Sequence, residues 1–165
     1  MPPVFTKHLA DRLNQLSKIH VHEAADGDLL EPGGAWIAPG NFHLTMRRHG
    51  TQLKAVLNQE TPENSCRPAV DILFRCAAGI FGANVLSVVM TGMGKDGQRG
   101  CSTIRQAGGR VLVQDEATSV VWGMPGAVVK AGHAHQIVPL QQIADEILLQ
   151  TLSGRTVRTP EKVGT

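Results

Sequence analysis

The sequence contains no tyrosine, only four phenylalanines and two tryptophans, and a net charge of just +2 over 165 residues. So few aromatic rings, with basic residues scattered along the chain, argue against a surface that binds nucleic acid. No apolar run approaches the roughly 20 residues that span a bilayer, and the first residues contain no apolar signal-peptide core. We therefore predict a cytoplasmic protein with neither nucleic-acid binding nor membrane insertion.

Cysteine is also scarce, and its spacing excludes two kinds of small scaffold. Cys66, Cys76 and Cys101 are widely separated and form no CxxC pair, so neither a disulfide framework nor a zinc ribbon is indicated. The pairs His20/His22 and His133/His135 have a spacing that can bind metal. No third ligand stands at a persuasive position, so we predict surface histidines, no metal site and no cofactor.

The first part of the chain predicts short elements. Helical spacing of apolar residues predicts a helix over residues 4–16, with Thr6 as a possible cap just inside its start. Four strand candidates separated by turn-rich stretches follow, at residues 20–23, 35–38, 42–47 and 52–57. They predict a hairpin-rich insertion of antiparallel character.

After residue 69, longer helices alternate with buried strands. Helices are predicted over residues 69–81, 96–107, 117–130 and 140–152, and strands over 85–90 and 110–113. Ile143, Ile147, Leu148 and Leu152 should share one face of the last helix. The alternation predicts an α/β fold with a doubly wound, mostly parallel sheet, flanking helices and a small antiparallel hairpin insertion. Residues 1–152 should form one domain and residues 153–165 a disordered tail.

The stretch VVMTGMGKDGQRG, from Val88 to Gly100, is the most informative. It runs from a buried strand through a glycine-rich loop into a helix, and sites in open α/β sheets lie beyond the carboxyl ends of strands. The loop satisfies GxGxxG, and Asp115 follows at about the distance that a dinucleotide-binding fingerprint requires. Against that reading, the Asp96 carboxylate would oppose a pyrophosphate at the helix N-terminus.

Asp96 is itself a candidate functional group. A carboxylate on a loop at a strand end can accept a hydrogen bond from a histidine, which is the third role in a serine–histidine–aspartate triad. Alternatively Asp96 only caps the following helix, because aspartate is a preferred N-cap residue. The two roles are compatible.

Several segments together resemble one family. TGMGKDG (residues 91–97) and QDEATSVVWGMPGAV (114–128) resemble the signature of the chemotaxis-specific protein-glutamate methylesterase. Residues 1–44 and RPAVDILFRCAAGIFG (67–82) resemble other segments of that family in the same order, apart from Cys76 where a serine is expected. The resemblance implies hydrolysis of glutamate methyl esters, with release of methanol, and deamidation of glutamines. Its partners would be the cytoplasmic domains of methylated chemoreceptors.

The resemblance also implies roles for loop residues. Asp96 matches the family's catalytic aspartate, and Met93 matches a methionine that lines the family's active site. Met93 and Gly94 are therefore expected to contact substrate, in a cleft that the segment from Trp122 to Pro125 also borders.

Two members of the family's triad have no counterpart in these 165 residues. The family's serine lies in a Gly-Ala-Ser-x-Gly-Gly loop, which this sequence does not contain. The family's histidine directly precedes the Met-Pro-Pro that forms residues 1–3 here. We therefore expect an N-terminally truncated catalytic domain without its first strand and nucleophile loop, and without the family's regulatory receiver domain. The alternative is a non-catalytic remnant or binding module.

Overall fold

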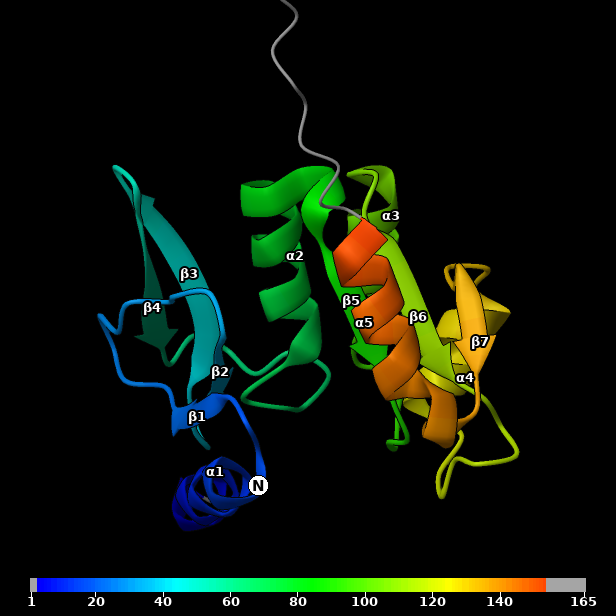
Figure 1. Ribbon diagram of the computed structural model, residues 1–165, viewed down its shortest axis with the longest axis horizontal. Helices are drawn as coiled ribbons and strands as arrows, with labels where there is room; N and C mark the ends of the chain where they lie inside the picture. Colours follow the sequence, from blue (N-terminus) through cyan, green and yellow to red (C-terminus); the bar gives the residue numbers. More distant parts are fainter. Residues whose placement is uncertain (1–2, 154–165) are drawn as a thin grey trace, which may run out of the picture.

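The computed structural model describes residues 3–153 (Figure 1). Its helices are α1 (Pro3–Leu16), α2 (Val70–Phe81), α3 (Gln98–Gln106), α4 (Met124–Lys130) and α5 (Ile143–Ser153), with 3-10 turns η1 (Gly82–Asn84) and η2 (Leu140–Gln142). Its strands are β1 (His20–Glu23), β2 (Gly34–Ile37), β3 (His43–His49), β4 (Gln52–Asn58), β5 (Leu86–Val89), β6 (Arg110–Gln114) and β7 (Gln136–Val138). The predicted tail lies outside the described residues, except for Ser153 at the end of α5. None of the helices within residues 3–153 has the length and apolar character needed to cross a bilayer.

The second half of the chain forms a parallel sheet with helices on both faces. The strands hydrogen-bond in the order β5-β6-β7. On one face Leu112 of β6 packs with Ile143 of α5. On the other, Val111 packs with Ile104 of α3 and Val128 of α4. This arrangement confirms the predicted α/β class, because the apolar side chains of the buried strands require cover on both sides.

The first half contains the predicted hairpin and one error. β3 and β4 pair antiparallel, with His49 opposite Gln52 at the turn, which confirms the small antiparallel insertion. β1 and β2 pair in parallel instead, with Val21 opposite Ala35. The prediction that these two strands share the antiparallel character was therefore wrong. The connection over residues 24–33 returns the chain to the same end of the pair, as parallel pairing requires.

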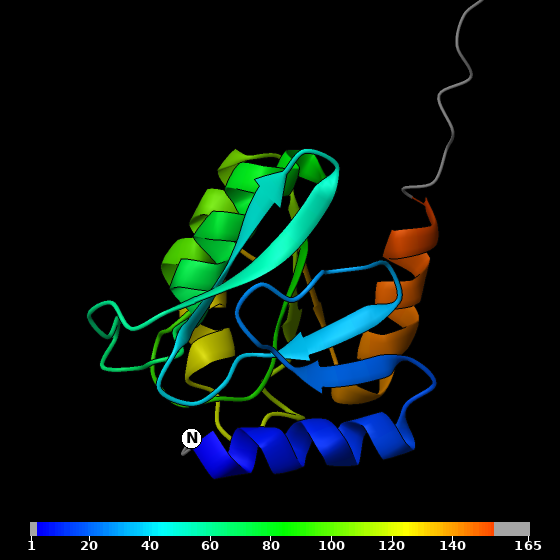
Figure 2. The same cartoon turned by 90° about the vertical axis from the view of Figure 1, so that its left-hand side faces the viewer.

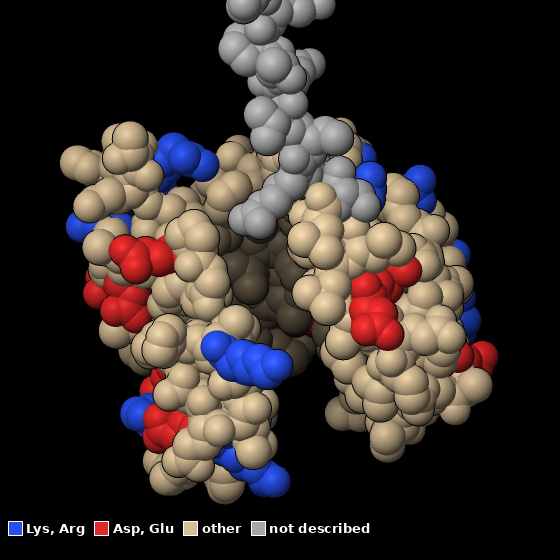
Figure 3. All heavy atoms as spheres, viewed as in Figure 1, with Lys and Arg blue, Asp and Glu red and all other residues tan. Residues whose placement is uncertain are grey.

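Two open sheet edges flank a hollow between the halves of the molecule. Within residues 3–153, β5 pairs only with β6, and β1 only with β2. Figures 1 and 2 show the α1–β4 part standing beside the β5–β7 sheet, with α1 lying along the base of the first half. Figure 3 shows a hollow between these two parts. Parallel strands are usually buried, so an open edge on β5 leaves room for a further strand.

Three local predictions were wrong or incomplete. Thr6 lies inside α1, and its hydroxyl donates to Glu23 (2.5 Å) and accepts from the backbone N–H of Gly40 (3.1 Å), which ties the helix to β1. The face predicted for α5 is covered only in part. Ile143 is buried, whereas Leu148 and Leu152 are 58% and 64% exposed. β7 was missed, because three residues are too few to show a period.

The helix predicted over residues 117–130 begins only at Met124. Before it, Asp115 Oδ1 accepts from the backbone N–H of Thr118 (3.0 Å) and holds a turn. A Cβ at Gly123 would lie 2.5 Å from the carbonyl oxygen of Gly92. The close contact with the neighbouring loop, and not helix propensity, therefore determines where α4 starts.

We expect Gly100→Ala to destabilise the protein, because α2 and α3 approach closely at this residue. A Cβ at Gly100 would lie 2.5 Å from the Cβ of Phe74, and the shift needed to accommodate it should cost about 1–3 kcal/mol. The matched control is Gly79→Ala in α2, where no atom lies within 4 Å. That methyl group should stabilise by about 0.5–1 kcal/mol. Urea unfolding compares the two, and equal stability would contradict the packing described here.

Candidate active site

Asp96 lies in the loop between β5 and α3, beyond the carboxyl end of β5, and is 7% exposed. Its Oδ1 accepts hydrogen bonds from Asn64 Nδ2 and from the backbone N–H groups of Asp71 and Gly97, each at 3.0 Å. Its Oδ2 accepts from the backbone N–H of Val70 at 2.7 Å. Val70 and Asp71 are the first two residues of α2. The carboxylate therefore caps α2, and not the following helix α3 as the capping alternative supposed.

Asp71, in the first turn of α2, makes the corresponding contact with the start of α3, and its side chain is buried, with 1% of the residue exposed. Its Oδ1 accepts from the backbone N–H of Gly100 (2.7 Å), in the first turn of α3. Its Oδ2 accepts from Asn64 Nδ2 (2.9 Å). The N-termini of both helices thus face buried carboxylates, which satisfies otherwise unpaired N–H groups and complements the helix dipoles.

The carboxylate of Asp96 has room for one more donor. Three hydrogen bonds end on Oδ1, but only that of Val70 ends on Oδ2 within the described residues. A carboxylate oxygen offers about two acceptor positions. The geometry is therefore that of a fixed carboxylate able to accept one further hydrogen bond, such as that of an imidazole N–H, at Oδ2.

The glycine-rich loop packs against the segment that precedes α4. The carbonyl of Gly92 accepts from the N–H groups of Gly123 (3.1 Å) and Met124 (2.7 Å), and Gly92 donates to the carbonyl of Val121 (3.1 Å). Met93 is 86% exposed, and Gly94 has φ +89°, a left-handed conformation that favours glycine. The structure therefore brings the loop of Met93 and Gly94 beside the segment around Trp122, which is half-buried.

Asp115, the acidic residue of the dinucleotide interpretation, is engaged elsewhere. Its Oδ1 accepts both from the backbone N–H of Thr118 and from the Thr118 hydroxyl (3.0 and 2.5 Å). The loop that would receive a pyrophosphate holds the Asp96 carboxylate instead, already bound to the first N–H groups of α2. This geometry gives dinucleotide binding no support.

No hydrogen bond joins Asp96 to a histidine within residues 3–153. His43, which sequence reasoning missed, is fully buried. Its Nδ1 accepts from the backbone N–H of Ala69 and its Nε2 lies 3.3 Å from the carbonyl of Thr61. One ring nitrogen therefore contacts the start of α2 and the other the connection before it, so His43 is not available as a base for Asp96.

The cysteines supply no activated nucleophile. Cys101 is fully buried, and loss of solvation raises the pKa of its thiol to about 12, so it stays protonated at neutral pH. Cys76 Sγ donates to the carbonyl of Met46 (3.3 Å) and lies 3.2 Å from its N–H, a contact between α2 and β3. Cys66 is exposed, and no hydrogen bond joins its thiol to a base in the described part of the chain.

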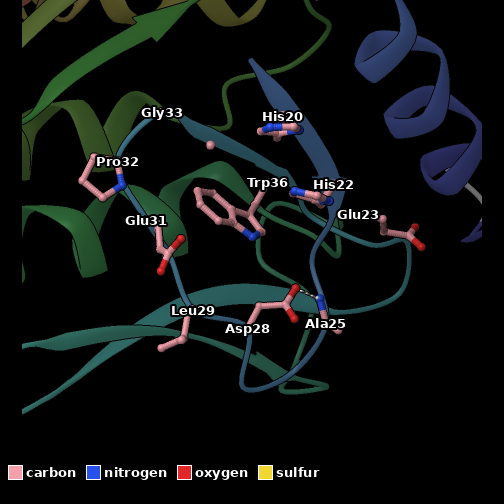
Figure 4. Close-up of a pocket in the computed structure, with 11 residues that line it drawn as sticks. His20, His22, Glu23, Ala25, Asp28, Leu29, Glu31, Pro32, Gly33 and Trp36 are labelled. Atoms are coloured by element: carbon pink, nitrogen blue, oxygen red, sulfur yellow. Dashed lines mark hydrogen bonds between the residues drawn. The ribbon is translucent and has the colours of Figure 1, made fainter. Parts of the chain in front are cut away.

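A pocket of about 460 Å³ lies beside β1 and β2, away from the glycine-rich loop (Figure 4). The rings of His20 and His22 stack there with centroids 6.3 Å apart, next to Trp36 and Glu31. Between residues 3 and 153 no group of three or more His, Cys, Asp or Glu side chains is arranged to hold a metal ion. The residues singled out from the sequence as catalytic do not line this pocket.

Comparison with known proteins identifies a family that matches most of the chain. The family model described as CheB methylesterase matches residues 1–147. The chain belongs to this family. The crystal structure of the Thermotoga maritima CheB methylesterase catalytic domain superimposes with a TM-score of 0.88 at 39% identity, over 91% of this chain and 79% of that one. This match confirms the fold class.

Two curated relatives are named protein-glutamate methylesterase/protein-glutamine glutaminase. The one from Trichodesmium erythraeum is 57% identical over 148 residues, 90% of this chain and 42% of the relative. The one from Pseudomonas aeruginosa, numbered 2, is 48% identical over 150 residues, 91% of this chain and 43% of the relative. The chain thus spans less than half the length of these relatives.

Two residues of the site, Asn64 and Asp71, were not predicted from the sequence. Asn64 lies between the strand predicted over residues 52–57 and the helix predicted over residues 69–81, and Asp71 lies within that predicted helix. The one local signal was an acidic residue in the first turn of a helix, which indicates a favourable helix end but not a second helix to cap.

We expect Asp71→Asn to lower the free energy of unfolding by about 1–3 kcal/mol. The substitution removes the negative charge at the start of α3. The new NH₂ group must also face another donor, either the NH₂ of Asn64 or the backbone N–H of Gly100. Asp145→Asn is the control, because Asp145 is exposed in the first turn of α5, and it should change stability by about 0.5 kcal/mol or less. Urea unfolding measures both, and an unchanged midpoint for Asp71→Asn would show that the carboxylate is not required there.

Proposed function

We propose that this chain forms the larger part of a catalytic domain that hydrolyses glutamate methyl esters and deamidates glutamines on the cytoplasmic domains of chemoreceptors. Asp96 is the carboxylate of its catalytic triad. The observation that carries the proposal is the state of Asp96: four hydrogen bonds fix a buried carboxylate, and Oδ2 keeps one open acceptor position. The names of the family relatives support the reaction class.

Asp96 acts through a histidine in this mechanism. A serine hydroxyl attacks the ester carbonyl while the histidine accepts its proton, and the proton then passes to the departing methanol. Water releases the acyl group by the same route in reverse and leaves the glutamate carboxylate; with glutamine the leaving group is ammonia. Asp96 Oδ2 orients the imidazole and stabilises the imidazolium, and the four existing hydrogen bonds prevent the carboxylate from rotating away.

The exposed loop beside Asp96 forms one side of the substrate site. Met93 and Gly94 contact the residues flanking the modified glutamate, and the segment around Trp122 lies against the same loop. The 86% exposure of the Met93 side chain leaves it free to contact a receptor helix. The substrate is a cytoplasmic receptor segment, which gives the protein a cytoplasmic location.

The serine and histidine come from a segment that these 165 residues do not include. That segment would pair with the open edge of β5 and occupy the hollow between the two halves, close to the loop that carries Asp96. The second candidate function is a non-catalytic remnant that binds receptors, because the chain contains no Gly-Ala-Ser-x-Gly-Gly motif.

A hybrid protein distinguishes the two candidates. In it, the segment of the Trichodesmium erythraeum relative that directly precedes its match to this chain is joined in front of residue 1. We expect the hybrid to release methanol from methylated receptor fragments and the 165-residue chain to release none, because a triad carboxylate alone activates no nucleophile. In the hybrid, Asp96→Asn should lower kcat by roughly 10⁴-fold.

The control for that substitution is Asp115→Asn in the hybrid, since Asp115 follows the neighbouring strand and its carboxylate binds, among residues 3–153, only Thr118. It should keep the activity of the parent hybrid. Methanol release by the 165-residue chain, or full activity of Asp96→Asn, would contradict the role of Asp96. A folded hybrid without activity would favour the remnant.

A further inference from the structure

We infer that Asn64 is a positioning residue for Asp96: its side-chain amide holds the carboxylate by Oδ1 and leaves Oδ2 as the position for the histidine. The part of the inference that assigns Oδ2 to the histidine rests on the proposed function. The placement of the carboxylate by Asn64 can be tested without any activity.

Asn64 is presented by a turn of unusual backbone conformation. Asn64 and Ser65 have φ of +52° and +61°, and positive φ at both central residues is the mark of a type I′ turn. Hydrogen bonds in both directions between the backbones of Glu63 and Cys66 close it (3.2 and 2.9 Å). Ser65 has neither the freedom of glycine nor the tolerance of asparagine in this region. A strained turn at this place persists only because its surroundings fix it.

Contacts on both sides of the turn fix it. Arg75 on α2 forms a paired contact with the two carboxylate oxygens of Glu63 (2.8 and 2.5 Å), and these hydrogen bonds hold the pKa of Glu63 below its usual range. The ion pair is therefore formed at neutral pH. Arg67 donates to Asn41 Oδ1 (2.7 Å) and to the carbonyls of Gln59 and Glu60. The connection that carries Asn64 is thus tied both to α2 and to the loop before β3.

The amide of Asn64 lies between two buried carboxylates. One nitrogen donates to Asp71 at 2.9 Å and to Asp96 at 3.0 Å, so the two accepting oxygens are no more than about 6 Å apart and their charges repel. An amide offers an N–H to each without carrying a positive charge. Lysine or arginine there would neutralise Asp96, whose negative charge the imidazolium requires. Asparagine fixes the carboxylate and leaves its charge available.

The hydrogen bond from Asn64 also determines which oxygen of the Asp96 carboxylate can accept a further donor. Oδ1 already accepts from Asn64, Asp71 and Gly97, so a further donor finds no position on it. Without the amide, the repulsion between the carboxylates of Asp71 and Asp96 is no longer offset, and the Asp96 carboxyl group can rotate. Oδ2 would then be presented to the histidine less often, and fewer enzyme molecules would hold the imidazole in the productive orientation.

The experiment compares two glycine substitutions in the turn. Asn64→Gly keeps the positive φ and removes the amide, whereas Ser65→Gly relieves φ at the exposed neighbouring residue and keeps the amide. In the hybrid we expect Asn64→Gly to lower kcat by about 10- to 100-fold with KM unchanged, since a charge-assisted hydrogen bond is lost. Ser65→Gly should match the parent in both constants. Asn64→Gly should unfold at a lower urea concentration than Ser65→Gly, because it leaves two buried carboxylates without a donor, so kcat is compared per folded protein.

Amide hydrogen exchange in the 165-residue chain provides a second measurement. For Asn64→Gly, the N–H groups of Val70, Asp71 and Gly97, which donate to Asp96, should exchange about 10-fold faster, whereas Ser65→Gly should leave them unchanged. Asn64→Asp, which keeps the turn and adds a third carboxylate, should have larger effects than Asn64→Gly in both experiments.

These results separate the inference from the proposed function. An inactive hybrid with Asn64 intact would overturn the function, and hydrogen exchange in the 165-residue chain would still decide the role of Asn64. Unchanged exchange at the three amides in Asn64→Gly overturns the inference. So does an active hybrid in which Asn64→Gly keeps its full kcat, or loses activity only in proportion to a loss of folded protein.

Discussion

The arrangement of the site depends on two buried carboxylates, each of which binds backbone N–H groups at the start of a helix, one at α2 and the other at α3. Asp96 accepts from the first N–H groups of α2, and Asp71 accepts from the first turn of α3. Because both carboxylates are buried, each needs hydrogen-bond donors, and the free N–H groups of a helix start supply them. The two helices approach so closely that only glycine fits at residue 100. The glycine-rich loop is thereby held at the carboxyl edge of the sheet.

The second constraint is the open edge of β5. This strand leads into the loop of Asp96, yet within residues 3–153 it has a neighbour on one side only. A hollow lies between the two parts of the molecule, and Leu148 and Leu152 of α5 are exposed. The described residues thus hold the buried Asp96 carboxylate at the end of a strand that is paired on one side only.

Elements with a strong local pattern were predictable from the sequence. The apolar run before Gly92 predicted β5, and the glycines predicted the loop that carries Asp96. The parallel pairing of β1 and β2 was not predictable, because both directions suit the same alternation. Asn64 and Asp71 were missed for a related reason. Their roles depend on contacts with residues 32 and 25 to 29 positions away, which no period in the sequence records.

The crystal structure of the hybrid is the most direct test of the central claim, that Asp96 is held ready to accept a histidine at Oδ2. We expect an imidazole nitrogen of the added segment about 2.7–3.2 Å from Oδ2, with Asn64, Asp71 and Gly97 still bound to Oδ1. A histidine hydrogen-bonded to another acceptor, with Asp96 holding only the donors it has now, would contradict the claim and leave Asp96 as a helix cap.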